Sequence, residues 1–198
     1  MILPNQLTVL RIILTPVFLF LFLSGDSLLI QISLGVYIIA AITDWYDGWL
    51  ARKFNYITDW GKFLDPLADK ILTSAAFIAF VYLDILELWM VLIIIIRDFF
   101  TTGLRAYADY QRVSFTTSNS AKWKTLLQMV FIYYLLVIYT IHQSPSIYNS
   151  NPELFNNLFD KVTIYYSMLV VTLVTLYTGL EYIWSNWLTI KKLLNFEN

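Results

Sequence analysis

Four aspartates lie close together in this sequence, in two pairs with helical spacing. Asp44 and Asp47 are three residues apart, and Asp65 and Asp69 are four apart. On an α-helix, each spacing places both carboxylates on one face. If all four carboxylates met in one pocket, each ionised pair about 4 Å apart would cost roughly 4 kcal/mol at an effective dielectric constant near 20. The cluster therefore predicts that some carboxylates are protonated or that cations lie among them. All-oxygen ligands favour Mg²⁺ or Mn²⁺, with Ca²⁺ as a further option.

The face that carries Asp44 and Asp47 continues with two small residues, Gly48 and Ala51. Positions 44, 47, 48 and 51 follow the i, i+3, i+4, i+7 rule of a helix face. Small residues let a ligand or a neighbouring helix approach the backbone closely. Arg52 follows directly, and arginine binds phosphate through two parallel hydrogen bonds. This pattern predicts a phosphate-containing ligand beside the acidic cluster.

A second group of charges is basic and lies outside the acidic stretch. Arg97 and Arg105 are eight residues apart, within roughly 80° on one helix face, and Lys122 and Lys124 follow later. We expect these four side chains to bind an anionic ligand. The alternative is that Arg97 pairs with Asp98 or another acid and that the two lysines anchor a helix end at the membrane surface.

The composition indicates a membrane protein. Hydrophobic residues make up 59% of the 198-residue chain and the mean hydropathy is +0.64, whereas soluble domains are nearer 45–50% apolar. A net charge of -1 gives no reason to expect nucleic acid, and the lack of cysteine excludes disulfides and thiolate metal sites. We find no linker or repeat, so residues 1–198 are expected to form one domain.

Six apolar stretches are long enough to be spanning helices, which need about 20 residues each. We therefore predict an all-α integral membrane protein with six transmembrane helices. Lys and Arg concentrate after the second and fourth stretches and in the tail, which predicts that both termini and the acidic motif face the cytoplasm. A short connection makes the second and third helices antiparallel neighbours whose acidic faces can meet. The six stretches are residues 7–24, 28–50, 61–84, 86–107, 121–141 and 158–187.

The residues from Asp44 to Asp69 resemble the signature of the CDP-alcohol phosphotransferase family at every fixed position. The pattern is Asp44-x2-Asp47-Gly48-x2-Ala51-Arg52-x8-Gly61-x3-Asp65-x3-Asp69. The opening at residues 4–11 is similar to that of the family. The Arg97-Asp98, Gly103-Leu104-Arg105 and Lys122-Trp123-Lys124-Thr125 runs resemble its phosphatidylglycerophosphate synthase branch. Ala121 departs from that branch, which usually has glycine there.

The resemblance implies a homodimer of six-helix protomers, each with a short N-terminal interfacial segment. The active site would be a polar cavity in the cytoplasmic membrane, open to the cytoplasm, and CDP-diacylglycerol would enter it from the lipid. The family pattern places the cytidine near Asn5, Thr8 and the Gly48/Ala51 face, with the diphosphate on two divalent metal ions and Arg52. Asp44, Asp47 and Asp65 would be primary metal ligands.

In the same pattern, Asp69 also lies near the second metal and is our candidate for the base that accepts the proton of the acceptor hydroxyl. The expected acceptor is sn-glycerol 3-phosphate, whose phosphate would bind Arg97, Arg105, Lys122 and Lys124. The products would be phosphatidylglycerophosphate and CMP. Other branches of the family use phosphatidylglycerol, inositol phosphate or serine. A different class, a cation- or proton-coupled transporter, also clusters acids in the membrane, but it needs neither the small-residue face nor the basic group.

Overall fold

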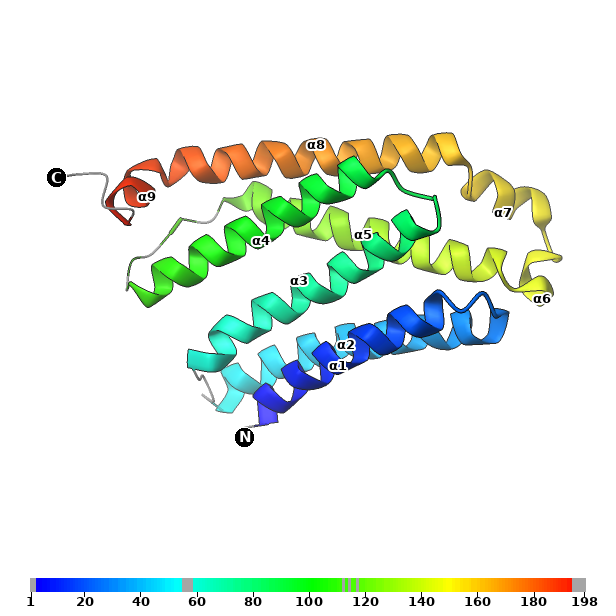
Figure 1. Cartoon of the computed structure of the whole chain (residues 1–198), viewed down its shortest axis with the longest axis horizontal. Coiled ribbons are helices and arrows are strands. Elements are labelled where there is room, and N and C mark those ends of the chain that lie inside the picture. Colours follow the sequence, from blue (N-terminus) through cyan, green and yellow to red (C-terminus); the bar gives the residue numbers. More distant parts are fainter. Residues whose placement is uncertain (1–2, 55–58, 112, 114, 117, 194–198) are drawn as a thin grey trace.

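The computed structural model describes residues 3–54, 59–111, 113, 115–116 and 118–193. Within these ranges the chain is helical, with turns and short connections but no strand, which confirms the all-α prediction (Figure 1). In this described part of the chain, three short helices accompany six long ones. The long helices are α1 (Leu3–Phe22), α2 (Ser27–Phe54), α3 (Asp59–Tyr82), α4 (Leu88–Tyr110), α5 (Asn119–His142) and α8 (Lys161–Ser185), and the short ones are α6 (Pro145–Tyr148), α7 (Pro152–Leu158) and α9 (Trp187–Leu193).

The long helices match the six predicted stretches to within a few residues. The main difference is at the start, where α1 already begins at Leu3. The expected interfacial segment is therefore not a separate element among the described residues. Pro4 is compatible with this start, because a residue in the first turn of a helix has no intrahelical partner for its N–H.

Two tight turns join antiparallel helices at the end of the bundle away from the termini. Gly25, between α1 and α2, has φ 74°, and Asp84, between α3 and α4, has φ 54°. The Asp26 carboxylate then accepts hydrogen bonds from the N–H groups of Leu28 and Leu29, at 2.9 and 3.0 Å. These bonds satisfy donors that the first turn of α2 would otherwise leave without partners.

The long helices run alternately up and down, so both ends of the described chain lie at the same end of the bundle as the C-terminal ends of α2 and α4 (Figure 1). Helix α1 packs against both α2 and α3, α3 packs on α4, and α8 packs on both α4 and α5. The second and third long helices are antiparallel, as predicted, but they make little direct contact. Instead, α1 provides most of the contacts that join them.

The bundle interior changes from apolar to polar along the helices. Toward the turn end, Phe22 packs against Phe80 and Tyr139, with ring centroids 5.3 and 5.1 Å apart. About two to four turns nearer the other end of α1, Thr15, Arg11 and Thr8 are buried instead. The aromatic half therefore supplies the packed core, and the polar half contains the site described below.

The outer surface is apolar, as expected for a membrane protein. Large hydrophobic side chains such as Phe20 on α1, Ile39 on α2, Ile96 on α4 and Leu180 on α8 are exposed. Among the described residues, three stretches could cross a membrane by length and composition: residues 27–44, 119–142 and 152–185. The apolar helix Gln6–Phe22 is shorter, and α3 and α4 carry charged residues. The count of six spans stays a prediction.

Candidate active site

Helix α1 connects the two acidic helices through two buried polar side chains. Arg11 is fully buried, and its Nη1 atom lies 2.5 Å from Oδ1 of Asp44 on α2. One turn earlier, the Thr8 hydroxyl donates to Oδ1 of Asp65 on α3, at 2.5 Å. Because Thr8 and Arg11 are three residues apart, they share a helix face. The acids on α2 and α3 are thus oriented by the same face of α1.

Three of the four predicted metal ligands are near enough to interact electrostatically, because the charges of Asp69 and Asp65 both act on Asp44. The side chains of Asp44 and Asp69 keep 41% and 22% of their surface exposed, so their carboxylates remain accessible to a ligand. Oxygen donors of this kind suit a hard divalent cation. Among the described side chains, no three acidic or imidazole groups form a metal site by themselves.

Several predicted site residues have side chains outside the described part of the structure. These are Asn5 on α1 and Asp47, Gly48, Ala51 and Arg52 on α2, whose backbones are helical. The fourth metal ligand and most of the expected nucleotide contacts belong to this group. Their roles stay predictions.

A cavity of about 870 Å³ lies between α3, α4 and α5 and the second half of α8. Its apolar wall includes Phe99, Met129 and Val130. The charged residues among its described lining are four cations and one acid: Lys70, Arg97, Arg105, Lys122 and Asp109. A concave site with an excess of positive charge attracts anions. The cavity is therefore suited to a small phosphorylated molecule.

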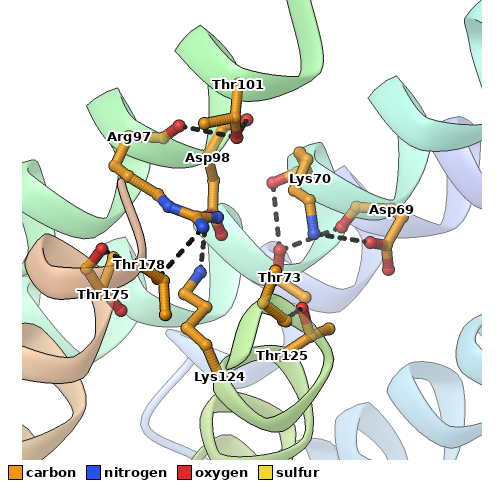
Figure 2. A network of polar contacts seen from close by, with 11 residues as sticks. Asp69, Lys70, Thr73, Arg97, Asp98, Thr101, Lys124, Thr125, Thr175 and Thr178 are labelled. Carbon is orange, nitrogen blue, oxygen red and sulfur yellow. Dashed lines mark hydrogen bonds and ion pairs between the residues drawn. The ribbon is translucent and has the colours of Figure 1, made fainter. Parts of the chain in front are cut away.

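Three of the four residues predicted to bind an acceptor phosphate, Arg97, Arg105 and Lys122, line this cavity, and Lys124 does not. The Lys124 side chain is 1% exposed, and its Nζ atom lies 2.5 Å from Oδ1 of Asp98 (Figure 2). The alternative that Lys124 anchors the helix at the membrane surface is therefore wrong, because its ammonium group is buried between helices.

Arg97 has the acidic partner that the sequence allowed as an alternative. Its Nη1 atom lies 3.0 Å from Oδ1 of Asp98, and Nη2 donates to the hydroxyl of Thr178 on α8, at 3.1 Å (Figure 2). The side chain still lines the cavity and is 14% exposed. An ion pair with Asp98 does not test whether the same guanidinium binds a phosphate, so that role stays a prediction.

The sequence reasoning overlooked Lys70, which joins the two parts of the site. Its Nζ atom lies 3.0 Å from Oδ2 of Asp69, and the side chain also lines the cavity (Figure 2). The available signal was a lysine directly after the last aspartate of the motif, on a helix that becomes apolar immediately afterwards. Glu181 on α8 accepts a hydrogen bond from Ser120 on α5.

The fold and the site together define an all-helical membrane protein in which a group of aspartates adjoins a cationic cavity. Comparison with known proteins makes this class specific. The family model for CDP-alcohol phosphatidyltransferase matches residues 1–174. The chain belongs to this family, whose members are enzymes that use a divalent metal.

Relatives of known name cover most of the chain. A Bacillus subtilis (strain 168) protein named CDP-diacylglycerol--glycerol-3-phosphate 3-phosphatidyltransferase is 37% identical, over 96% of this chain and 97% of its own length. Proteins with the same name from Rickettsia typhi and Salmonella paratyphi A are 38% and 37% identical, over 68% and 67% of this chain. The aligned segments cover 76% and 75% of the lengths of those two relatives.

The contact between Thr8 and Asp65 generates a prediction about metal affinity. Thr8→Val removes the hydroxyl that orients this carboxylate, and loss of such a partner typically weakens metal binding about ten- to a hundredfold. We expect the Mg²⁺ concentration for half-maximal activity to rise by that factor. Thr15→Val is the matched control, since the buried Thr15 hydroxyl donates only to the backbone carbonyl of Arg11. Equal shifts in both variants would contradict the role of Thr8.

Proposed function

We propose that this protein transfers the phosphatidyl group of CDP-diacylglycerol to sn-glycerol 3-phosphate, forming phosphatidylglycerophosphate and releasing CMP. The observation that carries the proposal is the 37% identity, over nearly the full length of both chains, to a relative named for this reaction. The cationic cavity beside Asp69 supports it, because an acceptor with a phosphate group needs such a site.

The nucleotide lipid would lie on the α1–α2 side of the site. We assign its binding to Asn5, Thr8, Gly48, Ala51 and Arg52, as the family pattern implies. Two features support this side. Thr8 is buried beside the acidic group, and the lipid-facing surfaces of α1 and α2 are apolar. The acyl chains could then stay in the bilayer while the diphosphate reaches the carboxylates.

Asp44, Asp47, Asp65 and Asp69 would hold two divalent ions, Mg²⁺ or Mn²⁺. When bound, such ions stabilise the negative charge that develops on the attacking and leaving oxygens of a phosphoryl transfer. The chain supports them with Arg11 and Thr8, which orient Asp44 and Asp65. These two partners restrict the carboxylates before any ligand binds.

Asp69 is the proposed base. It would accept the proton of the acceptor hydroxyl while that oxygen forms a bond to the lipid-side phosphorus, and the bond from phosphorus to the CMP oxygen would break. Its position supports this role, because Lys70 connects Asp69 to the cavity in which the acceptor would lie. The acceptor phosphate would contact Arg97, Arg105 and Lys122, which line that cavity.

We further propose that the site faces the cytoplasm, in the cytoplasmic membrane. Basic residues such as Lys53 and Lys122 lie near the connections at the end of the bundle that also carries both termini (Figure 1). Lysine and arginine are concentrated in cytoplasmic loops of membrane proteins. A homodimer is proposed from the family resemblance alone, and the mass of the protein in detergent would test it.

The acceptor and the need for metal can be tested in one assay. Purified protein is incubated with CDP-diacylglycerol and Mg²⁺, and with glycerol 3-phosphate, phosphatidylglycerol, inositol phosphate or serine as the acceptor. We expect phosphatidylglycerophosphate and CMP from glycerol 3-phosphate alone. EDTA should abolish turnover, and Mg²⁺ or Mn²⁺ should restore it. A different lipid product would identify another branch of the family, and full activity in EDTA would refute the metal assignment.

Asp69→Asn tests the proposed base. The amide cannot accept a proton, so kcat should fall strongly, whereas the apparent affinity for CDP-diacylglycerol should change much less because ground-state binding can survive. Asp84→Asn is the control, since Asp84 is exposed in the turn between α3 and α4. Near-normal turnover of Asp69→Asn would rule out the base assignment.

Arg105→Ala tests the acceptor cavity. Loss of one hydrogen bond to a charged group costs about 1.5–3 kcal/mol, so KM for glycerol 3-phosphate should rise about ten- to a hundredfold. KM for CDP-diacylglycerol should change much less. Glycerol, which lacks the phosphate, should be a poor acceptor for the wild type and little affected by the substitution. Equal weakening of both substrates would mean that Arg105 serves the structure or the nucleotide.

The orientation can be tested with single cysteines, because the chain has none of its own. Ser150 is exposed in the turn between α6 and α7, and Gln111 is exposed at the end of α4, at the opposite end of the bundle. In intact cells, a membrane-impermeant maleimide should label Ser150→Cys but label Gln111→Cys only after permeabilisation. The reverse pattern would place the site on the outer side.

A further inference from the structure

Asp98 binds two cations from different helices with a single oxygen atom. Its Oδ1 lies 2.5 Å from Nζ of Lys124 on α5 and 3.0 Å from Nη1 of Arg97, the preceding residue on α4 (Figure 2). Asp98 and Lys124 are almost completely buried. Removing one member of a buried ion pair leaves the other charge uncompensated, so the three side chains must act as a unit.

The opposite side of Arg97 is held by α8. The Thr178 hydroxyl donates its own hydrogen to the backbone carbonyl of Thr175, at 3.1 Å, so toward Arg97 its oxygen acts as an acceptor. The aliphatic part of Arg97 packs on Gly179, where a Cβ atom would lie 3.0 Å from Cγ of Arg97. Even an alanine at position 179 would therefore require the Arg97 side chain to shift by a few tenths of an ångström. The arginine is restricted by α4, α5 and α8 together.

The net charge of Arg97, Asp98 and Lys124 favours the binding of an anion beside one of these side chains. Arg97 and Lys124 carry two positive charges and Asp98 carries one negative charge, which leaves one positive charge in excess. Lys124 is enclosed and does not line the cavity, whereas Arg97 does. The excess charge is therefore available to a ligand only at the Arg97 guanidinium.

We propose that Asp98, Lys124 and Gly179 are positioning residues that hold the Arg97 guanidinium at the cavity wall, and that Lys124 does not itself contact the acceptor. This inference deepens the proposed function and rests on it, because the ligand of Arg97 is the phosphate of the acceptor. A guanidinium that is already held in place loses less conformational freedom when a phosphate binds.

Charge-neutralising substitutions separate positioning from direct binding. Lys124→Gln leaves Asp98 to neutralise Arg97, so the group of three side chains loses its excess positive charge. Asp98→Asn leaves two buried cations that repel each other. The double variant, Asp98→Asn with Lys124→Gln, returns the group to one positive charge on Arg97 and keeps hydrogen-bonding side chains at both positions.

The experiment is a double-mutant cycle in which kcat, KM for glycerol 3-phosphate and KM for CDP-diacylglycerol are measured for all four proteins. We expect each single substitution to raise KM for glycerol 3-phosphate about ten- to a hundredfold and to change KM for CDP-diacylglycerol much less. The double variant should recover most of that loss. If Lys124 bound the phosphate directly, the double variant would be no better than Lys124→Gln, and that result would overturn the proposal.

A smaller change at Gly179 tests the same positioning role if a charge-neutralising substitution prevents folding. Gly179→Ala places a methyl group against Arg97, whereas Gly35→Ala on α2 places one where no atom lies within 4 Å. We expect Gly179→Ala to raise KM for glycerol 3-phosphate selectively, with Gly35→Ala unchanged. An unaltered KM in Gly179→Ala, or equal increases for both substrates, would count against positioning.

Product formation by the wild-type protein distinguishes failure of the proposed function from failure of this inference. Absence of phosphatidylglycerophosphate from the wild-type reaction would overturn the proposed function and this inference with it. If the wild type forms the product but the cycle shows no recovery in the double variant, the proposed function stands and only the positioning role fails.

Discussion

A charged side chain inside a membrane helix needs a partner on the protein, because the surrounding lipid offers neither water nor counterions. The structure satisfies this constraint with contacts between helices. Arg11 on α1 pairs with Asp44 on α2, and Lys124 on α5 pairs with Asp98 on α4. Each ion pair connects two helices at one level along the bundle. The polar half of the bundle is thus organised by charge compensation, whereas the other half is organised by aromatic packing.

These pairs divide the site into two connected parts. On one side, α1 orients the acids of α2 and α3 through Arg11 and Thr8. On the other, α4 and α8 hold Arg97 at the wall of the cationic cavity. Lys70 lies between them, in contact with Asp69 and with the cavity. An enzyme that brings a nucleotide lipid and a phosphorylated acceptor together needs this adjacency, since the two anions must approach closely before a bond can form.

Much of the fold and of the acidic site could be predicted from the sequence. Helix positions followed from runs of apolar residues, and their ends were wrong by only a few residues because lipid leaves the backbone no alternative to a helix over such runs. The pairing of the aspartates on helix faces is a local property of their spacing. The basic group was less predictable. The alternative in which Arg97 pairs with Asp98 is confirmed, and Lys70 was overlooked, whereas the phosphate role of Lys124 stays a prediction.

The residues alone identify the class of protein: an all-helical membrane enzyme of one family, with its aspartates at helical spacing and its basic residues on two later helices. Which of these charges face the cavity and which compensate one another depends on the packing of the helices. The physical reason is that burial depends on how α3, α4, α5 and α8 are rotated and packed against each other. Arg97 and Lys124 are equivalent as charges in the sequence, yet their different depths give one access to a ligand and enclose the other beside Asp98.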